Sequence, residues 1–179
     1  LKAFDTGPGC AMIDDWLLAR TGAPFDRDGG LAARGRLNTA GLAELMRHPY
    51  FLEPPPKSLD RNVFDSAPLS ALSDADGAAT LVAFTARTVA EGLLNCPKPA
   101  RSLLVTGGGR HNLTLMTAIA ECVRIPVVPV ESLGWRGDAL EAEAFAYLAI
   151  RSQRGMALSV PETTGVDRPR TGGVLYRSR

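Results

Sequence analysis

The sequence is poor in the residues that build metal centres. Of its 179 residues, only three are cysteines and two are histidines. Cys10, Cys96 and Cys122 are far apart, and none stands at the short spacing of a zinc site. We therefore expect free thiols in a reducing cytoplasm and no Cys/His metal centre. The ligands of any other metal ion stay unassigned.

The sequence also has no excess charge of one sign and no long apolar run. Its 20 Lys and Arg nearly balance 19 Asp and Glu, which leaves a net charge of +1. A nucleic-acid-binding domain carries a basic face, and a membrane-spanning helix needs about 20 apolar residues. We therefore expect no nucleic-acid partner and no membrane partner. The length and the 45% hydrophobic content favour one globular core.

The sequence does not begin with methionine, and its first residues lead us to expect no signal peptide. The chain begins with Leu1-Lys2-Ala3-Phe4-Asp5, an apolar run that is typical of a buried strand. Because the first residues already have the pattern of a buried strand, we expect the chain to be a C-terminal portion of a longer protein.

Strand-like and helix-like segments alternate along the chain. Strands are predicted at residues 1–5, 102–106 and 126–130. Helices are predicted at residues 10–20, 38–47, 73–94, 112–123 and 138–151. This order favours an α/β domain with a mixed sheet flanked by helices.

Two glycine loops each follow a predicted strand. The first is Asp5-Thr6-Gly7-Pro8-Gly9, and the second is Gly107-Gly108-Gly109-Arg110-His111-Asn112. Backbone N–H groups in such loops, and at the start of a helix, bind phosphate. The second loop lacks the Gly-Lys-Ser/Thr of a Walker motif, and Asn112 replaces the last glycine of the dinucleotide fingerprint. A tight turn with Asn112 as helix N-cap explains it equally well.

Two acidic residues are candidates for chemistry. Asp5, at the end of the first predicted strand, can act as a general base or hold a metal–phosphate group, or it can simply close an Asx turn. Glu141 stands at the N3 position of a capping box that begins at Asp138. It also shares a helix face with Phe145 and Leu148, where an acid is either paired or functional.

Two basic residues lie near these motifs. Lys57 follows Pro54-Pro55-Pro56, where a lysine can meet phosphate or remain an ordinary surface residue. His111, beside the glycines, is expected to be a structural donor rather than a catalyst.

These motifs together resemble the C-terminal half of the anhydro-N-acetylmuramic acid kinase family. The matching stretches are Phe4–Gly9, Pro54–Ser58, Gly107–Asn112, Asp138–Ala149 and Thr163–Val166. The resemblance implies that residues 1–179 form one lobe of a sugar-kinase/actin-like ATPase (ribonuclease H-like) fold, with the N-terminal lobe absent. It further implies a cytoplasmic, homodimeric enzyme of peptidoglycan recycling.

The resemblance also implies a reaction. Water opens the 1,6-anhydro ring of anhydro-N-acetylmuramic acid while ATP, with Mg²⁺, phosphorylates O6. Asp5 matches the base that activates this water. The positions that match nucleotide-binding residues are Thr6, Gly7, Gly9, Gly107, Gly108, Gly109 and Asn112. Glu141 and Lys57 are expected to contact the sugar.

Three departures from the family pattern qualify this interpretation. Cys10 stands where an Asn is expected, Leu59-Asp60 replaces a common Thr-Gly pair, and the lobe with the first phosphate loop is missing. We therefore expect the isolated chain to be inactive. Two alternatives stay open: a non-catalytic nucleotide-binding module, and another sugar or acetate-type kinase of the same fold. Asp5 and Glu141 disfavour the first, and the Pro-Pro-Pro-Lys-Ser segment disfavours the second.

Overall fold

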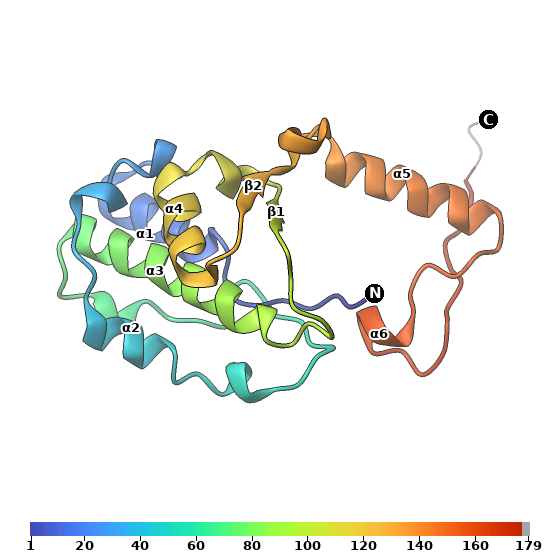
Figure 1. The fold of residues 1–179 in the computed structure, drawn as a ribbon, viewed down its shortest axis with the longest axis horizontal. Coiled ribbons are helices and arrows are strands. Elements are labelled where there is room, and N and C mark those ends of the chain that lie inside the picture. Colours follow the sequence, from blue (N-terminus) through green and yellow to red (C-terminus); the bar gives the residue numbers. More distant parts are fainter. Residues whose placement is uncertain (177–179) are drawn as a thin grey trace.

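Helices dominate the computed structural model, which describes residues 1–176 (Figure 1). The long helix α3 (Asp74–Leu93) runs through the main body, and α1, α2 and α4 pack against it. These three helices are Ala11–Thr21, Thr39–Leu45 and Leu113–Val123. Two further helices, α5 (Leu140–Gln153) and α6 (Pro161–Thr164), form an arm beside the body. Short 3₁₀ turns lie at Arg27–Gly29, Ala32–Arg34, Pro49–Leu52, Ala67–Leu69, Gly108–His111 and Val130–Leu133.

The core is built on α3. Its Leu81 and Phe84 have no exposed surface, and Ser73 caps its first turn by accepting a hydrogen bond from the Asp76 N–H at 3.1 Å. A Cβ at Gly77 would overlap the ring of Trp16, so this glycine allows α1 to approach closely. The Trp16 indole also donates to the Asp74 carbonyl at 2.9 Å. Helix α1 is thereby held close to α3.

The sheet is small. Strands β1 (Leu103–Val105) and β2 (Val127–Pro129) are parallel, and Leu104 pairs with Val128. Helix α4 connects them, as expected of a parallel pair. This βαβ unit places the second glycine loop at the end of β1. The α/β prediction is thus confirmed in part, because in residues 1–176 the sheet consists of this parallel pair.

The predicted strand at residues 1–5 is wrong for this structure. Two backbone hydrogen bonds hold the segment, from Ala3 N to the Glu162 carbonyl at 3.4 Å and from Asp5 N to the Lys57 carbonyl at 3.1 Å. An apolar run becomes a strand only when a second strand lies alongside it. Within the described residues no strand pairs with this segment, so a mixed sheet is not formed.

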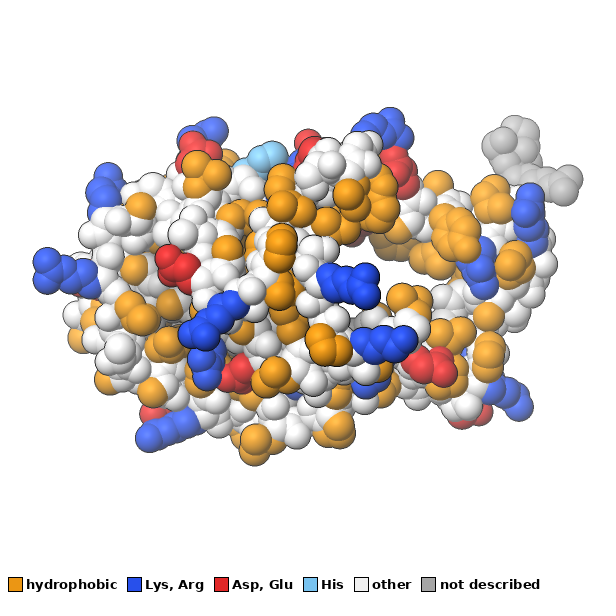
Figure 2. Space-filling view, viewed as in Figure 1, with side chains coloured by type: hydrophobic (Ala, Val, Ile, Leu, Met, Phe, Trp, Pro, Cys, Tyr) orange, Lys and Arg blue, Asp and Glu red, His pale blue; other side chains and the backbone are white. Residues whose placement is uncertain are grey.

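The arm exposes apolar surface. No residue of α5 is buried, and Phe145 is 66% exposed. Orange side chains are visible along the arm in Figure 2. An isolated antiparallel bridge joins Ser159 to Arg170. Among the helices of residues 1–176, none is both long and apolar enough to cross a membrane.

Candidate functional site

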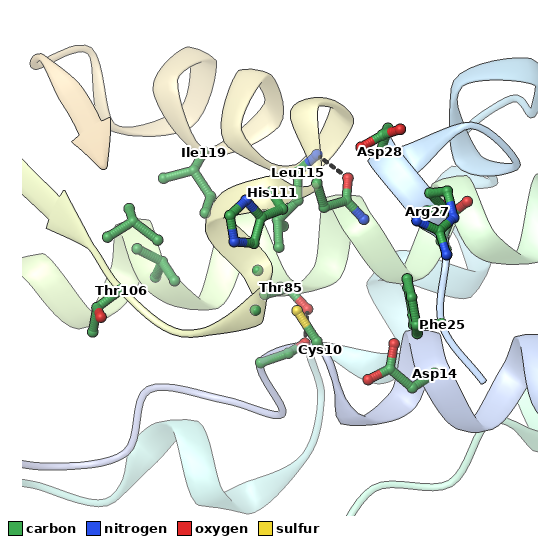
Figure 3. A pocket seen from close by; sticks show the side chains of 17 residues that line it. Cys10, Asp14, Phe25, Arg27, Asp28, Thr85, Thr106, His111, Leu115 and Ile119 are labelled. Atoms are coloured by element: carbon green, nitrogen blue, oxygen red, sulfur yellow. Dashed lines mark hydrogen bonds between the residues drawn. The ribbon is translucent and has the colours of Figure 1, made fainter. Parts of the chain in front are cut away.

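A cavity of about 910 Å³ lies between α1, α3, α4 and the loop that precedes the first 3₁₀ turn (Figure 3). The glycine loops contribute Gly9, Cys10, Gly108, Gly109, His111 and Asn112 to its lining. Its apolar wall is formed by Val89, Val105, Leu115 and Ile119. A cavity of this size, with an apolar wall and polar groups beside it, is typical of a small-molecule site.

The two glycine loops meet at this cavity. A Cβ added at Gly109 would lie 3.0 Å from the Cys10 sulfur, so the loops are in close contact. Thr85 of α3 donates to the Gly9 carbonyl at 2.7 Å and fixes the first loop. Gly9 and Gly107 have φ values of 58° and 74°, a region that favours glycine. The structure therefore brings together Gly9, Gly108 and Gly109, whereas Gly107 lies just outside the lining.

Asn112 caps helix α4. Its Oδ1 accepts a hydrogen bond from the Leu115 N–H at 2.9 Å, drawn as the dashed line in Figure 3, and the residue is 8% exposed. The N-cap interpretation from the sequence is thus confirmed. The start of α4 also borders the cavity, where the helix dipole and unpaired N–H groups favour an anion.

Sequence reasoning missed the opposite wall of the cavity. Phe25, Arg27 and Asp28 lie there, in a segment that has no helical or strand period (Figure 3). Asp26 holds this segment, because its carboxylate accepts hydrogen bonds from the Leu31 and Ala32 N–H groups at 2.8 and 3.0 Å. No spacing rule links this loop to a glycine loop eighty residues later, so only the folded chain reveals the wall.

Two of the titratable side chains that line the cavity have shifted pKa values. Burial raises the pKa of the Asp14 carboxyl, and nearby Arg61 opposes this shift. Burial, followed by the charge of Asp14, raises the pKa of the Cys10 thiol. Cys10 is therefore a weakly reactive thiol at neutral pH.

Asp5 lies outside the cavity lining, on an exposed but well-anchored segment. Its Oδ2 accepts a hydrogen bond from the Leu59 N–H at 2.7 Å, and its carbonyl accepts one from the Tyr50 hydroxyl, also at 2.7 Å. Its own N–H donates to the Lys57 carbonyl. The carboxylate is thus held in one orientation while facing solvent.

Lys57 belongs to the same cluster. Its Nζ donates to the Tyr50 carbonyl at 2.8 Å and lies 4.2 Å from the centre of the Tyr50 ring. Burial, with smaller contributions from Asp5 and Glu53, raises the pKa of Tyr50 to about 12. Tyr50 therefore remains a proton donor to Asp5, a contact that sequence reasoning did not foresee.

Thr6 and Gly7 pack against α3 rather than into the cavity. A Cβ at Gly7 would overlap the Thr88 side chain, and one at Gly92 would overlap the methyl group of Thr6. In this structure the two residues hold the first loop on the helix, and their nucleotide-binding role stays a prediction.

Glu141 is exposed in the first turn of α5 and is not part of the cavity lining. The capping box predicted for it is wrong, because the N-cap is Ala139 and no side chain caps the helix. Asp138 instead accepts a hydrogen bond from Arg110 at 2.6 Å, which lowers the pKa of Asp138. The helix therefore begins two residues later than predicted.

Metal ligands are sparse. In residues 1–176, no group of three or more His, Cys, Asp and Glu side chains could hold a metal ion. The cavity offers the carboxylates of Asp14 and Asp28 as separate oxygen donors.

Comparisons with known proteins point to one family. The sequence profile of the family "Anhydro-N-acetylmuramic acid kinase" matches residues 1–178. A protein of that name from Rhizorhabdus wittichii is 56% identical over 177 residues, which cover 99% of this chain and 48% of the relative. One from Rhodospirillum rubrum is 53% identical over 174 residues, 97% of this chain and 46% of the relative. The chain therefore spans about half the length of the curated relatives it matches.

Proposed function

The chain belongs to the anhydro-N-acetylmuramic acid kinase family, and on that premise we propose that it is the C-terminal lobe of such a kinase. The complete enzyme opens the 1,6-anhydro ring with water and phosphorylates O6 from ATP, giving N-acetylmuramic acid 6-phosphate. The proposal includes a cytoplasmic location, a role in peptidoglycan recycling, a homodimer, and the sugar-kinase/actin-like ATPase fold.

The cavity shared by the two glycine loops is the observation that carries this proposal. Gly9, Gly108 and Gly109 line it together with the start of α4. Phosphoryl transfer depends mainly on backbone donors that position the phosphates. The apolar wall at Val89 and Ile119 suits a nucleotide base. We therefore assign ATP to this cavity.

Asp5 suits the role of general base. A base must lie on a rigid element within hydrogen-bond reach of the attacking water, and Asp5 is anchored through both its backbone and its Oδ2. The water oxygen bonds to the anomeric carbon, the bond from that carbon to O6 breaks, and Asp5 accepts the proton. O6 then takes the γ-phosphoryl group, and ADP leaves.

Glu141 and Lys57 complete the proposed sugar site, from α5 and from the Asp5 cluster respectively. For Mg²⁺, the donors present fit an ion held mainly by ATP phosphates with one carboxylate, because Asp14 and Asp28 line the cavity separately. When bound, Mg²⁺ neutralises charge that develops on the phosphates.

A non-catalytic nucleotide-binding module is the second candidate. It is favoured by one observation: neither Asp5 nor Glu141 lines the cavity. A substrate panel of sugars with and without the anhydro bridge separates the proposed kinase from other sugar kinases.

The decisive test uses a fusion in which the upstream half of the 56%-identical relative is joined to Leu1 of this chain, called here the two-half protein. The variant to test in it is Asp5→Asn. We expect kcat to fall by about 10²- to 10⁴-fold, the usual contribution of a general base, with ATP affinity unchanged. Asp15→Asn, an equal change at an exposed residue of α1, serves as the control. An unchanged kcat in Asp5→Asn would support the module instead.

A further inference from the structure

Arg110 is a buried charged residue that the proposed chemistry does not use. Its side chain is only 3% exposed. The guanidinium Nη1 donates to the Gly107 carbonyl at 2.8 Å, Nε donates to Glu131 at 2.8 Å, and Nη2 donates to Asp138 at 2.6 Å. One side chain therefore contacts three separate segments of the chain.

These segments are different parts of the proposed site. Gly107 begins the second glycine loop, Glu131 lies in the turn after β2, and Asp138 lies two residues before α5. A planar guanidinium with several fixed N–H groups can hold such partners together, whereas a single ammonium group cannot match the geometry.

The chain around Arg110 is shaped to admit the guanidinium. A Cβ at Gly137 would overlap both Arg110 Nε and the Glu131 carboxylate. The Gly137 carbonyl also accepts a hydrogen bond from Thr106, at the end of β1, at 3.3 Å. The segment that enters α5 is thus fastened to the β1 end of the sheet and to Arg110.

Helix α5 depends on this attachment. None of its residues is buried, so packing does not orient it. The side-chain hydrogen bonds of Arg151 and Ser152 run to Tyr147, Ala157 and Gly172, all within the arm. The arm also contacts the main body at α6, where Ala3 N donates to the Glu162 carbonyl at 3.4 Å. The contacts at the start of α5 are the ones that join the segment next to Glu141 to the second glycine loop and to the end of β1.

We propose that Arg110 is a positioning residue that couples the second glycine loop to the start of α5, so that one guanidinium sets the geometry for both ATP and sugar. The assignment of ligands to the two segments rests on the proposed function. The mechanical coupling does not, because it follows from the contacts of Arg110 alone.

The coupling is tested first by hydrogen exchange in the 179-residue chain. In Arg110→Met, amides of residues 107–112 and of residues 134–142 should both exchange faster than in the wild type. Arg110→Lys should fail to restore protection. Arg87→Met removes an arginine of an exposed ion pair on α3 and should change neither segment. Unchanged exchange, or a change in one segment only, would overturn the coupling.

Asp138→Asn provides a milder variant should Arg110→Met not fold. The Asp138 side chain is 86% exposed, so the change leaves the core intact. It should raise exchange in residues 134–142 while sparing residues 107–112, which retain the bond to the Gly107 carbonyl. If the exchange of residues 107–112 and of residues 134–142 changes to the same extent in this variant, the result counts against the proposal.

Kinetics of the two-half protein test the functional consequence. Arg110→Met should raise KM for both ATP and the anhydro-sugar about tenfold, the scale of a lost charge-assisted hydrogen bond. Asp138→Asn should raise KM for the sugar and leave KM for ATP within about twofold. A purely structural role would lower kcat with the folded fraction and leave both KM values unchanged. If the two-half protein shows no kinase activity, the proposed function fails, while the exchange experiment still decides the coupling.

Discussion

At the scale of single residues, Tyr50 explains how an exposed acid is held in place. Tyr50 is 5% exposed and packs near Phe64, with ring centres 6.3 Å apart. Its hydroxyl reaches the carbonyl of Asp5, which is forty-five residues earlier in the chain. The orientation of the proposed base thus depends on a phenol that belongs to none of the matching motifs.

Tyr50 should make the free energy of unfolding fall as the pH becomes alkaline. Its pKa rises from 10.0 unfolded to about 12 folded, so the folded state keeps the proton longer. The stabilisation is complete below pH 10 and is lost as pH rises from about 10 to 12. Tyr50→Phe loses about 1 kcal/mol at pH 8, from the missing hydrogen bond. Its further loss between pH 10 and 12 should be smaller than that of the wild type.

Urea unfolding at several pH values measures both effects. The Cys10 thiol, whose pKa is also raised, titrates in both proteins and therefore cancels in the comparison. Parallel decline of the two stability curves would contradict the role given to Tyr50.

At the scale of elements, the two glycine loops use glycine for different reasons. Gly7 is required by packing, because a Cβ there would overlap Thr88 of α3. Gly108 lines the cavity, and no atom lies within 4 Å of a Cβ built on it. The first loop is therefore constrained by the core, and part of the second is open toward the cavity.

The substitutions Gly7→Ala and Gly108→Ala should separate these roles. Gly7→Ala should lower the free energy of unfolding by about 1–3 kcal/mol, the usual cost of overpacking. Gly108→Ala should leave it within about 0.5 kcal/mol yet weaken ATP binding by the two-half protein, because its methyl group enters the cavity. Urea unfolding and ATP titration provide the readouts. Equal unfolding midpoints for the two variants would refute the distinction.

At the scale of the whole molecule, we propose that the described residues supply only part of the kinase site. The chain spans about half the length of its relatives. Asp5 faces solvent, and α5 exposes apolar side chains. A kinase of two lobes excludes water from its phosphates when the lobes close, and one lobe by itself has nothing to close against.

The 179-residue chain alone should therefore show no ATP-dependent phosphorylation of the anhydro-sugar. Mass spectrometry of the reaction mixture would detect the 6-phosphate product, with the two-half protein as positive control and its Asp5→Asn variant as background. Product above that background from the isolated chain would refute this prediction.

The sequence predicted the local structure well where local forces decide it. The helix predicted at residues 10–20 forms as α1, which buries Ile13, Trp16 and Leu17, and Asn112 caps α4, one of the two interpretations that the sequence left open. Hydrophobic periodicity and N-cap chemistry act over a few residues, so they can be read from the chain. The five matching stretches, taken together, likewise indicated the family, which the profile match confirms.

Tertiary structure decided everything that depends on distant partners. Residues 1–5 form no strand because no neighbouring strand pairs with them, and Asp138 fails to cap α5 because Arg110 binds it. The cavity wall at Phe25 and the hold of Tyr50 on Asp5 join segments far apart in sequence. Helical periods and loop glycines are properties of neighbouring residues and were determined by the sequence itself. Strand pairing, the choice of ion-pair partner and the shape of the cavity depend on interactions between remote segments, which come into contact only in the folded chain.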